Sequence, residues 1–196
     1  MMLIYLTHPQ VRIDPAAPVP EWSLSELGVS RLAGLAGRPW LGQITAIFSS
    51  METKAMEAAA ILGRLAGIGV KALPDMGEND RSATGFLQPV EFEAAADQFF
   101  AQPEASFRGW ERAVDAQARI SAAVDRALAN APLAANILFV GHGAVGTLLK
   151  CSLTGKRISR SEDQKPGGGQ VFAYDLAGKR LACDWTPVED WKGELS

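Results

Sequence analysis

The stretch ILFVGHGAVG, residues 137–146, is an apolar run that ends at a histidine and continues into glycine-rich sequence. LIYLTHPQ, residues 3–10, has the same order: an apolar run, a histidine, and then a residue with unusual backbone properties. The two histidines of the chain, His8 and His142, both lie in these stretches. Since short apolar runs with β-branched residues are typical of buried strands, each stretch predicts a strand with a histidine at its carboxyl end.

Further strands and helices alternate outward from these two stretches. ITAIFSS, GVKALPD and a closing hairpin made by QVFAYDL and RLACDWT around Ala177 and Gly178 are the other predicted strands. Helices are expected at 51–65, 89–102, 108–130 and 143–155. Strands that alternate with helices of this length indicate an α/β sandwich with a largely parallel sheet.

One more helix is predicted within WSLSELGVSRLAGLAG, residues 22–37, and its start is defined by a local motif. Ser23 followed three residues later by Glu26 matches a capping box, and Trp22 with Leu27 matches the hydrophobic staple across it. We therefore expect the helix to begin directly after Ser23.

Composition limits the classes of protein to which the chain can belong. Its 196 residues are expected to form one domain, 1–196, and 47% hydrophobic with 21% charged residues is usual for a globular protein. A formal net charge of −3 gives no basic patch for nucleic acid or a membrane surface, and no apolar run is long enough to span a membrane. Cys151 and Cys183 have neither metal-ligand nor disulfide-framework spacing, so we expect a cytoplasmic protein without a bound metal.

Four polar residues are predicted to gather on one rim of the sheet. His8, Ser49 and His142 each lie at the carboxyl end of an expected strand, and Glu78 lies in the turn-rich loop 76–89 after another. In open α/β sheets, ligands bind at the carboxyl ends of the strands. Imidazole near neutral pH acts as a nucleophile or as a cation, depending on its hydrogen-bonded partner. Two histidines at equivalent places favour a catalytic use over a purely structural one.

Gly141, Gly143 and Gly146 spell the G-x-G-x-x-G pattern of dinucleotide-binding proteins, after a strand and at a helix start. The context argues against a nucleotide cofactor, because a polar loop follows the helix where that motif requires a strand ending in an acid. The glycines instead favour close backbone approach and free amides at a helix N-terminus, a general seat for an anion. No cofactor is expected, and an oxidoreductase that binds NAD(P) is a third, disfavoured alternative.

The order and spacing of five motifs resemble the histidine phosphatase superfamily, which contains the cofactor-dependent phosphoglycerate mutases and many small phosphatases. These motifs are LIYLTHP, WSLSELGVSRLAGLAG, IFSSMETKAMEAAAIL, GENDRSATG and ILFVGHGAVGTLL, within residues 2–155. The resemblance implies a three-layer α/β/α sandwich with a largely parallel central sheet, as in the phosphoglycerate mutases. It also implies a phosphatase that works through a phosphohistidine, independently of any metal.

The resemblance assigns roles to the site residues. His8 matches the histidine that attacks phosphorus, His142 the charged donor beside the moving phosphoryl group, and Glu78 the acid that protonates the leaving oxygen. Gly143, at the start of the helix after His142, is a candidate phosphate ligand through its amide. The substrate would then be a phosphorylated small molecule or a phosphoprotein.

Three positions depart from the family's pattern. Thr7 stands where the family has arginine before the nucleophile, Pro9 where it has glycine, and Lys54 where a helix offers a second arginine to the phosphate. Removing one preorganised donor of this kind typically costs about 10²- to 10³-fold in rate. Thr7 and Lys54 stay candidate phosphate ligands. Arg81 and Arg12 are the candidates for a replacement guanidinium, because they are close in sequence to Glu78 and His8.

Two functional hypotheses follow. The first is a phosphoric monoester hydrolase with a phosphohistidine on His8, and the alternative is a family member that has lost turnover and binds a phosphorylated ligand or protein. A mutase is disfavoured, because the loops that would hold a bisphosphate are sparse. Four aromatic residues, in the loop 76–89 or after it, are expected to line an apolar subsite or to pack in the core: Phe86, Phe99, Phe107 and Trp110. The sequence leaves the oligomeric state open.

Overall fold

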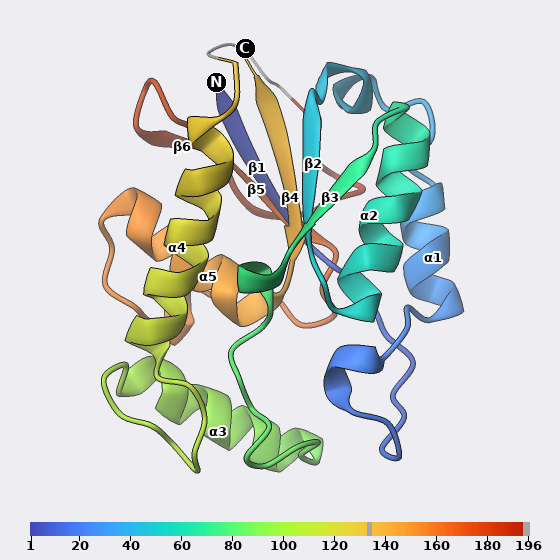
Figure 1. Ribbon diagram of the computed structural model, residues 1–196. Coiled ribbons are helices and arrows are strands. Elements are labelled where there is room, and N and C mark those ends of the chain that lie inside the picture. The colour runs from blue at the N-terminus through green and yellow to red at the C-terminus, as the bar shows by residue number, and fades with distance from the viewer. Residues whose placement is uncertain (133–134, 194–196) are drawn as a thin grey trace.

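The chain folds around one mixed sheet (Figure 1). The computed structural model describes residues 1–132 and 135–193, and within them the sheet has six strands in the order β3-β2-β4-β1-β5-β6. The strands are β1 (Met2–Thr7), β2 (Ala46–Ser50), β3 (Val70–Leu73), β4 (Asn136–Gly141), β5 (Gln170–Asp175) and β6 (Arg180–Pro187). β1 to β4 run parallel, whereas β5 is antiparallel to both of its neighbours. The predicted largely parallel sheet and its closing hairpin are confirmed.

Helices cover both faces of this sheet. They are α1 (Glu26–Ala33), α2 (Thr53–Ala66), α3 (Pro89–Ala101), α4 (Ala113–Ala129) and α5 (Gly143–Thr154), with short 3-10 turns at Val19–Glu21, Pro39–Gln43, Pro74–Met76 and Arg160–Glu162. α1 and α2 pack on one face, and α4 and α5 pack on the other (Figure 1). The molecule therefore has the three layers that the resemblance implies.

The burial of β1 explains the apolar run at the start of the chain. Leu3 and Tyr5 belong to the core shared with α4 and α5, whereas Ile4 and Leu6 belong to the core shared with α1 and α2. All four side chains are fully buried. A strand that is covered on both faces needs apolar residues at every position, because neither face meets water.

α1 begins two residues later than the capping box predicts. Its N-cap is Ser25, whose hydroxyl accepts the Gly28 amide N–H, so the prediction of Ser23 as the cap is wrong. Leu24 is the cause: it forms an isolated β-bridge with Val11, which keeps the backbone extended past Ser23. The predicted staple is also wrong on one side, because Leu27 is exposed.

α4 begins at Ala113, although the sequence predicts a start at 108. Arg108 and Gly109 both have positive φ, 53° and 83°, a conformation that an α-helix of L-residues does not accept. The predicted end of the last helix is confirmed. α5 ends at Thr154, and its C-cap Gly155 has a left-handed φ of 66°.

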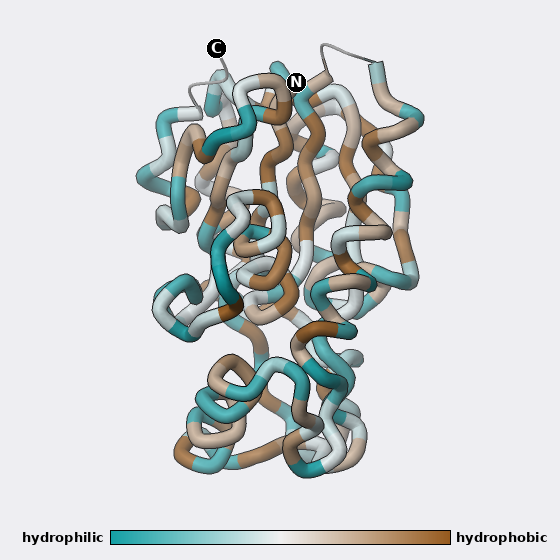
Figure 2. The backbone as a smooth tube through the Cα atoms, turned by 90° about the vertical axis from the view of Figure 1, so that its left-hand side faces the viewer, coloured by the Kyte–Doolittle hydropathy of each residue, from teal (hydrophilic) through white to brown (hydrophobic). Residues whose placement is uncertain are grey.

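α3 and its flanking loops lie beyond the carboxyl ends of the parallel strands (Figure 1). Figure 2 shows this part joined to the sheet and its helices through a narrow waist. Phe99 and Phe100 anchor α3 in the core on the α4 and α5 side. The rim of the sheet that carries the predicted site residues therefore has a cover. No helix in the described part of the chain is both long and apolar enough to cross a membrane.

Candidate active site

Strand register brings the two histidines together. β1 and β4 pair in parallel with Thr7 opposite Gly141, so His8 and His142 leave their strands at the same level. The His8 amide continues the pairing by donating to the Gly141 carbonyl, at 2.9 Å. The two imidazole centroids lie 5.2 Å apart, with ring planes inclined by 70°. The parallel pairing of β1 and β4 therefore places the two histidine rings, which end similar stretches of sequence, next to each other.

One ring nitrogen of His8 is hydrogen-bonded, and the other has no hydrogen-bond partner within the described residues. Nδ1 lies 2.8 Å from the Pro9 carbonyl oxygen, and because a carbonyl only accepts, Nδ1 carries the proton. Nε2 is then left with a lone pair, and the residue lines a large cavity at this rim. Burial lowers the pKa of His8 to about 4, although the Pro9 carbonyl opposes this effect. The ring is neutral near pH 7, as a nucleophile requires.

His142 is the N-cap of α5 and is fully buried. Its Nε2 lies 2.8 Å from the Ser50 hydroxyl and 3.3 Å from Oε1 of Glu52. Among the described residues Nδ1 has no hydrogen-bond partner. Burial lowers the pKa of His142, and the Glu52 carboxylate opposes this. Ser49, predicted on the same rim, turns away and donates its hydroxyl to the Ser50 carbonyl.

Glu78 reaches the same place from the loop that follows β3. Its Oε1 accepts the amide of Val145 at 3.1 Å, and its Oε2 lies 3.3 Å from the amide of Ala144, so the carboxyl group sits at the N-terminus of α5. It also lines the cavity. Burial raises the pKa of Glu78, against the opposing charge of Arg81. A carboxyl group with a raised pKa beside a nucleophile is suited to general acid catalysis.

Lys54 points inward and is only 4% exposed. Its Nζ donates to Oε2 of Glu52 at 2.5 Å and to the Val19 carbonyl at 2.8 Å, and it lines the cavity. The carboxylate of Glu52, the N-cap residue of α2, offsets the unfavourable position of a cation in the first helical turn.

Glu52 was not a candidate from the sequence, yet it joins three site residues. Besides Lys54 and His142 it contacts the loop of Glu78, whose amide it accepts at 2.8 Å. Burial works against its charge, but His142 and Lys54 outweigh that effect and lower the pKa of Glu52 to about 2. The only local signal for Glu52 was an acid at a helix start, which is too common to indicate a site.

Thr7 is buried and does not line the cavity. Its hydroxyl oxygen accepts the Gln170 amide at 3.0 Å and donates to Oε1 of Gln164 at 2.7 Å. The second amide atom of that glutamine, Nε2, lies over the start of α5, since a Cβ added to Gly143 would meet it at 2.4 Å. Thr7, expected to contact phosphate itself, thus holds Gln164, which lines the cavity and was not a candidate from the sequence.

The three glycines of the G-x-G-x-x-G pattern have uses unrelated to a dinucleotide. A Cβ on Gly141 would lie 2.2 Å from the Tyr5 hydroxyl, and one on Gly146 would lie 2.4 Å from the ring of Tyr5. Both glycines therefore make room for an aromatic core residue. Gly143 lines the cavity, and among the described residues its amide has no acceptor, whereas the next two amides bind Glu78.

The two candidate arginines occupy different places. The guanidinium of Arg81 lines the cavity and stacks over the rings of Phe92 and Trp110, with its carbon 5.1 and 5.5 Å from their centroids. Within the described residues it has no ion pair or side-chain hydrogen bond. Arg12 is exposed and lies outside the cavity lining. Arg81 is accordingly the candidate that the geometry favours as a replacement guanidinium.

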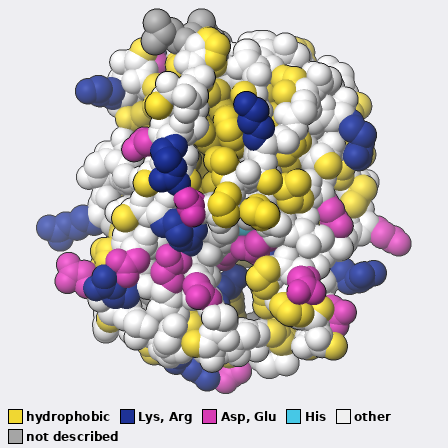
Figure 3. All heavy atoms as spheres, in the orientation of Figure 1, with side chains coloured by type: hydrophobic (Ala, Val, Ile, Leu, Met, Phe, Trp, Pro, Cys, Tyr) yellow, Lys and Arg dark blue, Asp and Glu magenta, His cyan; other side chains and the backbone are white. Residues whose placement is uncertain are grey.

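The cavity that these residues share has a volume of about 690 Å³. One end holds the polar groups near the histidines, and the other end is walled by aromatic side chains from α3 and the neighbouring loops. In the lower half of the face shown in Figure 3, acidic and basic side chains surround a hollow. A cavity of this size accommodates a small organic molecule and not only an inorganic ion.

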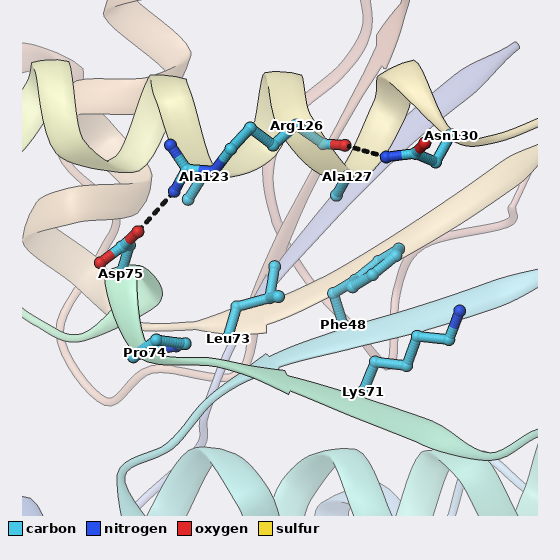
Figure 4. A pocket seen from close by; sticks show the side chains of 9 residues that line it. All are labelled: Phe48, Lys71, Leu73, Pro74, Asp75, Ala123, Arg126, Ala127 and Asn130. Carbon is cyan, nitrogen blue, oxygen red and sulfur yellow. Dashed lines mark hydrogen bonds and ion pairs between the residues drawn. The ribbon is translucent and has the colours of Figure 1, made fainter.

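A second hollow lies between α4 and the strands β2 and β3 (Figure 4), with a volume of about 440 Å³. Phe48 and Leu73 form its floor, and Arg126 pairs with Asp75 at its rim (Figure 4). None of the predicted site residues lines it. Its lining contains no His, Ser, Thr or Cys, and its arginine is paired with Asp75, so the chemistry points to the larger cavity.

Arg119 positions the loop of Glu78. Its guanidinium donates to the carbonyls of Asp75, Gly77 and Glu78 at 2.9 to 3.1 Å, and it pairs with Glu111 at 2.8 Å. This role of Arg119 could not be predicted from the sequence, because the residue belongs to a helix that is remote from the loop along the chain.

Arg31 does the same for the backbone beside His8. The carbonyl of His8 accepts the amide of Gly169, and a Cβ on Gly168 would lie 2.2 Å from that carbonyl. Arg31 donates to the carbonyls of both glycines and pairs with Glu189. The glycine run 167–169, in which every φ is positive, is thereby fixed against the backbone of His8.

No group of three or more His, Cys, Asp or Glu side chains suited to a metal ion occurs in the described ranges. The polar end of the cavity instead collects donors, namely amides, an ammonium and a guanidinium. Such a set is suited to the oxygens of an anion.

Comparison with known proteins decides the family. The chain matches the model of the histidine phosphatase superfamily (branch 1) over residues 16–184. It belongs to the histidine phosphatase superfamily. The resemblance seen in the five motifs is confirmed, although the matched part begins after His8 and leaves the divergent Thr-His-Pro motif outside. A comparison with curated proteins found no match.

Solved structures show how widely this superfamily fold is shared at low identity. Bacillus stearothermophilus YhfR aligns with a TM-score of 0.76 and 18% identity, covering 100% of this chain and 98% of that chain. A mycobacterial glucosyl-3-phosphoglycerate phosphatase in complex with inorganic phosphate gives 0.74 and 20%, covering 94% of each chain. An Entamoeba histolytica phosphoserine phosphatase in complex with 3-phosphoglyceric acid gives 0.72 and 15%, covering 94% of this chain and 96% of that one. At these identities the likeness establishes the fold.

Proposed function

We propose that the protein is a phosphoric monoester hydrolase that works through a phosphohistidine on His8. The observation that carries the proposal is the free Nε2 of a neutral His8, in a ring whose centroid lies 5.2 Å from that of His142. Membership of a superfamily whose distant structural relatives include named phosphatases supports it.

The reaction has two steps. In the first, Nε2 of His8 attacks phosphorus, an N–P bond forms, and the P–O bond to the alcohol breaks while Glu78 gives its proton to the leaving oxygen. In the second, water attacks phosphorus, Glu78 takes a proton from that water, and the N–P bond breaks. Inorganic phosphate leaves, and His8 and Glu78 are back in their starting states.

Five donors would bind the phosphoryl oxygens. The amide of Gly143 and the Nε2 of Gln164 meet over the start of α5, and the cations are Lys54 and Arg81. His142 completes the set, because a bound anion favours the protonated ring and so raises its pKa. In this arrangement Gln164 and Arg81 together take the role of the arginine that the family has at the position of Thr7.

The alternative is a protein that binds a phosphorylated ligand or protein without turnover. The contact between Lys54 and Glu52 favours this alternative. Lys54 stands in the place of the second arginine, and the Glu52 carboxylate at 2.5 Å already neutralises its charge. Binding of phosphate or vanadate with no hydrolysis of a broad panel of monoesters would select this alternative.

The test compares the protein with His8→Asn, which keeps a side chain of similar shape. With 4-nitrophenyl phosphate as substrate we expect the variant to lose at least about 10³-fold in kcat/KM. A ³²P-labelled substrate quenched in alkali should leave label on the wild type and none on His8→Asn. Equal rates for the two proteins would reject the proposal. Rates unchanged by a chelator are expected, since the steps use only side chains and water.

A further inference from the structure

Five aromatic rings form a wall in the same cavity. Trp22 and Phe86 face each other with centroids 5.5 Å apart, and Phe92, Phe99 and Trp110 form a second group with centroids 6.1 to 6.4 Å apart. Phe99 and Trp110 are nearly buried, whereas Phe86 and Phe92 keep part of their surface open. All five line the cavity, so the open apolar surface lies next to the reacting groups.

The polar atoms of this wall are turned away from the cavity. The indole N–H of Trp110 donates to Thr84 at 2.9 Å, and that of Trp22 donates to the Asp14 carbonyl at 2.8 Å. The indoles therefore offer a ligand their carbon surface and no donor. A sugar or glycerol group packed on these rings would leave its hydroxyls without hydrogen-bond partners there, which is unfavourable for a buried polar group.

The two arginines beside the aromatic wall also differ in whether they can bind a ligand. Arg160 lines the cavity but is paired with Glu93 at 2.5 Å and with Asp163 at 3.3 Å. Arg81 keeps its donors free while it stacks on two rings. Of the two arginines that line the cavity, Arg81 is therefore the one without an ion pair among the described residues, and its contact with both rings places it where a phosphate oxygen attached to an apolar group would lie.

We propose that the preferred substrates are phosphoric monoesters of a bulky apolar alcohol, with an aromatic group that packs on the wall formed by Trp22, Phe86, Phe92, Phe99 and Trp110. This inference rests on the proposed function. The phosphoryl group lies between His8 and Arg81, and the aromatic body of the alcohol fills the apolar end of the cavity. A cavity of about 690 Å³ has room for both.

Three substrates with primary alcohol leaving groups test this without a difference in chemical reactivity: 2-(1-naphthyl)ethyl phosphate, ethyl phosphate and glycerol 3-phosphate. The naphthyl substrate should have about 100-fold higher kcat/KM than ethyl phosphate, because it buries the apolar carbon of two fused rings against the wall. Glycerol 3-phosphate should be no better than ethyl phosphate. Comparable values for all three, or a preference for glycerol 3-phosphate, would overturn the inference.

A single residue of the wall sharpens the result. Phe86→Ala should lower kcat/KM for the naphthyl substrate about tenfold, since an aromatic contact of this kind is lost, and change that for ethyl phosphate less than about twofold. Phe107→Ala is the matched control, because Phe107 lies in the same part of the chain but outside the cavity lining. An equal loss for both substrates in Phe86→Ala would show a structural role instead.

Binding of phosphonates separates this inference from the proposed function, because their P–C bond is not hydrolysed. Calorimetry should give tighter binding and a more negative heat-capacity change for 2-(1-naphthyl)ethylphosphonate than for ethylphosphonate. Selective binding without turnover of any ester would leave the wall inference standing and reject the hydrolase. Turnover with no selectivity in rate or in binding would do the reverse.

Discussion

The two ends of the cavity differ in how their polar groups are used. At the phosphoryl end the ionisable side chains already have partners: Lys54 is paired with Glu52, and Glu78 accepts backbone amides at the start of α5. At the aromatic end the two indole N–H groups are already hydrogen-bonded, and Arg81 has no ion pair or side-chain hydrogen bond within the described residues. Under the proposed function, this difference means that a cation for phosphate lies on the wall that would recognise the leaving group. Phosphate binding and substrate choice are thereby made to depend on the same loop.

The largest effect is expected from removing the acid at the phosphoryl end. Glu78→Gln should lower kcat for the naphthylethyl ester about 10²- to 10⁴-fold, because an alkoxide leaves poorly without a proton. 4-Nitrophenyl phosphate should lose much less, since nitrophenolate needs little protonation. Steady-state rates on both substrates measure this, and the exposed Glu104→Gln is the control. An equal loss on both substrates would contradict the acid role.

Removing the cation at the border of the two ends should have the next largest effect. Arg81→Ala is expected to lower kcat/KM about 100-fold for every monoester, as for other preorganised donors to a transition state. The matched control is Arg126→Ala, whose guanidinium belongs to the second hollow. If Arg81→Ala affected only the bulky substrates, the arginine would belong to the aromatic end alone and the comparison of the two ends would break.

A smaller effect is expected at Gln164, the neutral donor of the phosphoryl end. Gln164→Ala should weaken the binding of inorganic phosphate about tenfold, because it removes one hydrogen bond to an anion. Calorimetric titration with phosphate measures this, with the exposed Gln102→Ala as control. Unchanged affinity would remove Gln164 from the donor set and leave Thr7 with a purely structural contact.

The smallest effect concerns stability. The pKa of His8 is about 4 in the folded protein and near its ordinary value of 6.5 in the unfolded chain. The unfolded chain therefore binds more protons between these values, and stability falls as pH drops from 6.5 towards 4. Between pH 7 and pH 5 this contributes roughly 1 kcal/mol, allowing for partial exposure of the ring. Urea unfolding should show that His8→Asn loses this part of the pH dependence, and an identical slope would contradict the neutral ring.

Sequence was sufficient where a residue's place follows from its own strand. His8 and His142 were placed correctly because each ends an apolar run, and parallel strands present their carboxyl ends on one rim. Glu78 followed from its loop and from the order of the motifs. The same local reasoning failed at Ser23, because a bridge from Leu24 to the distant Val11 outweighed a good capping pattern.

Sequence was insufficient where function depends on a contact between distant segments. Gln164 reaches Thr7, and Arg119 reaches the Glu78 loop, in each case from a segment that carries no motif. Lys54 was recognised as the replacement of an arginine, but its pairing with Glu52 required side-chain geometry, since a lysine in a first helical turn is equally compatible with solvent. Charge compensation of this kind has no local pattern.

The glycine run 167–169 sets a boundary for anyone who would engineer the specificity of this protein. A side chain at Gly168 would collide with the carbonyl of His8, so a library that randomises this loop would mostly yield proteins in which His8 is displaced. Phe86 carries no comparable constraint, because its ring is half-buried, lines the cavity and does not contact Arg81. Diversity placed there would change which molecule is chosen while the reacting groups stay where they are.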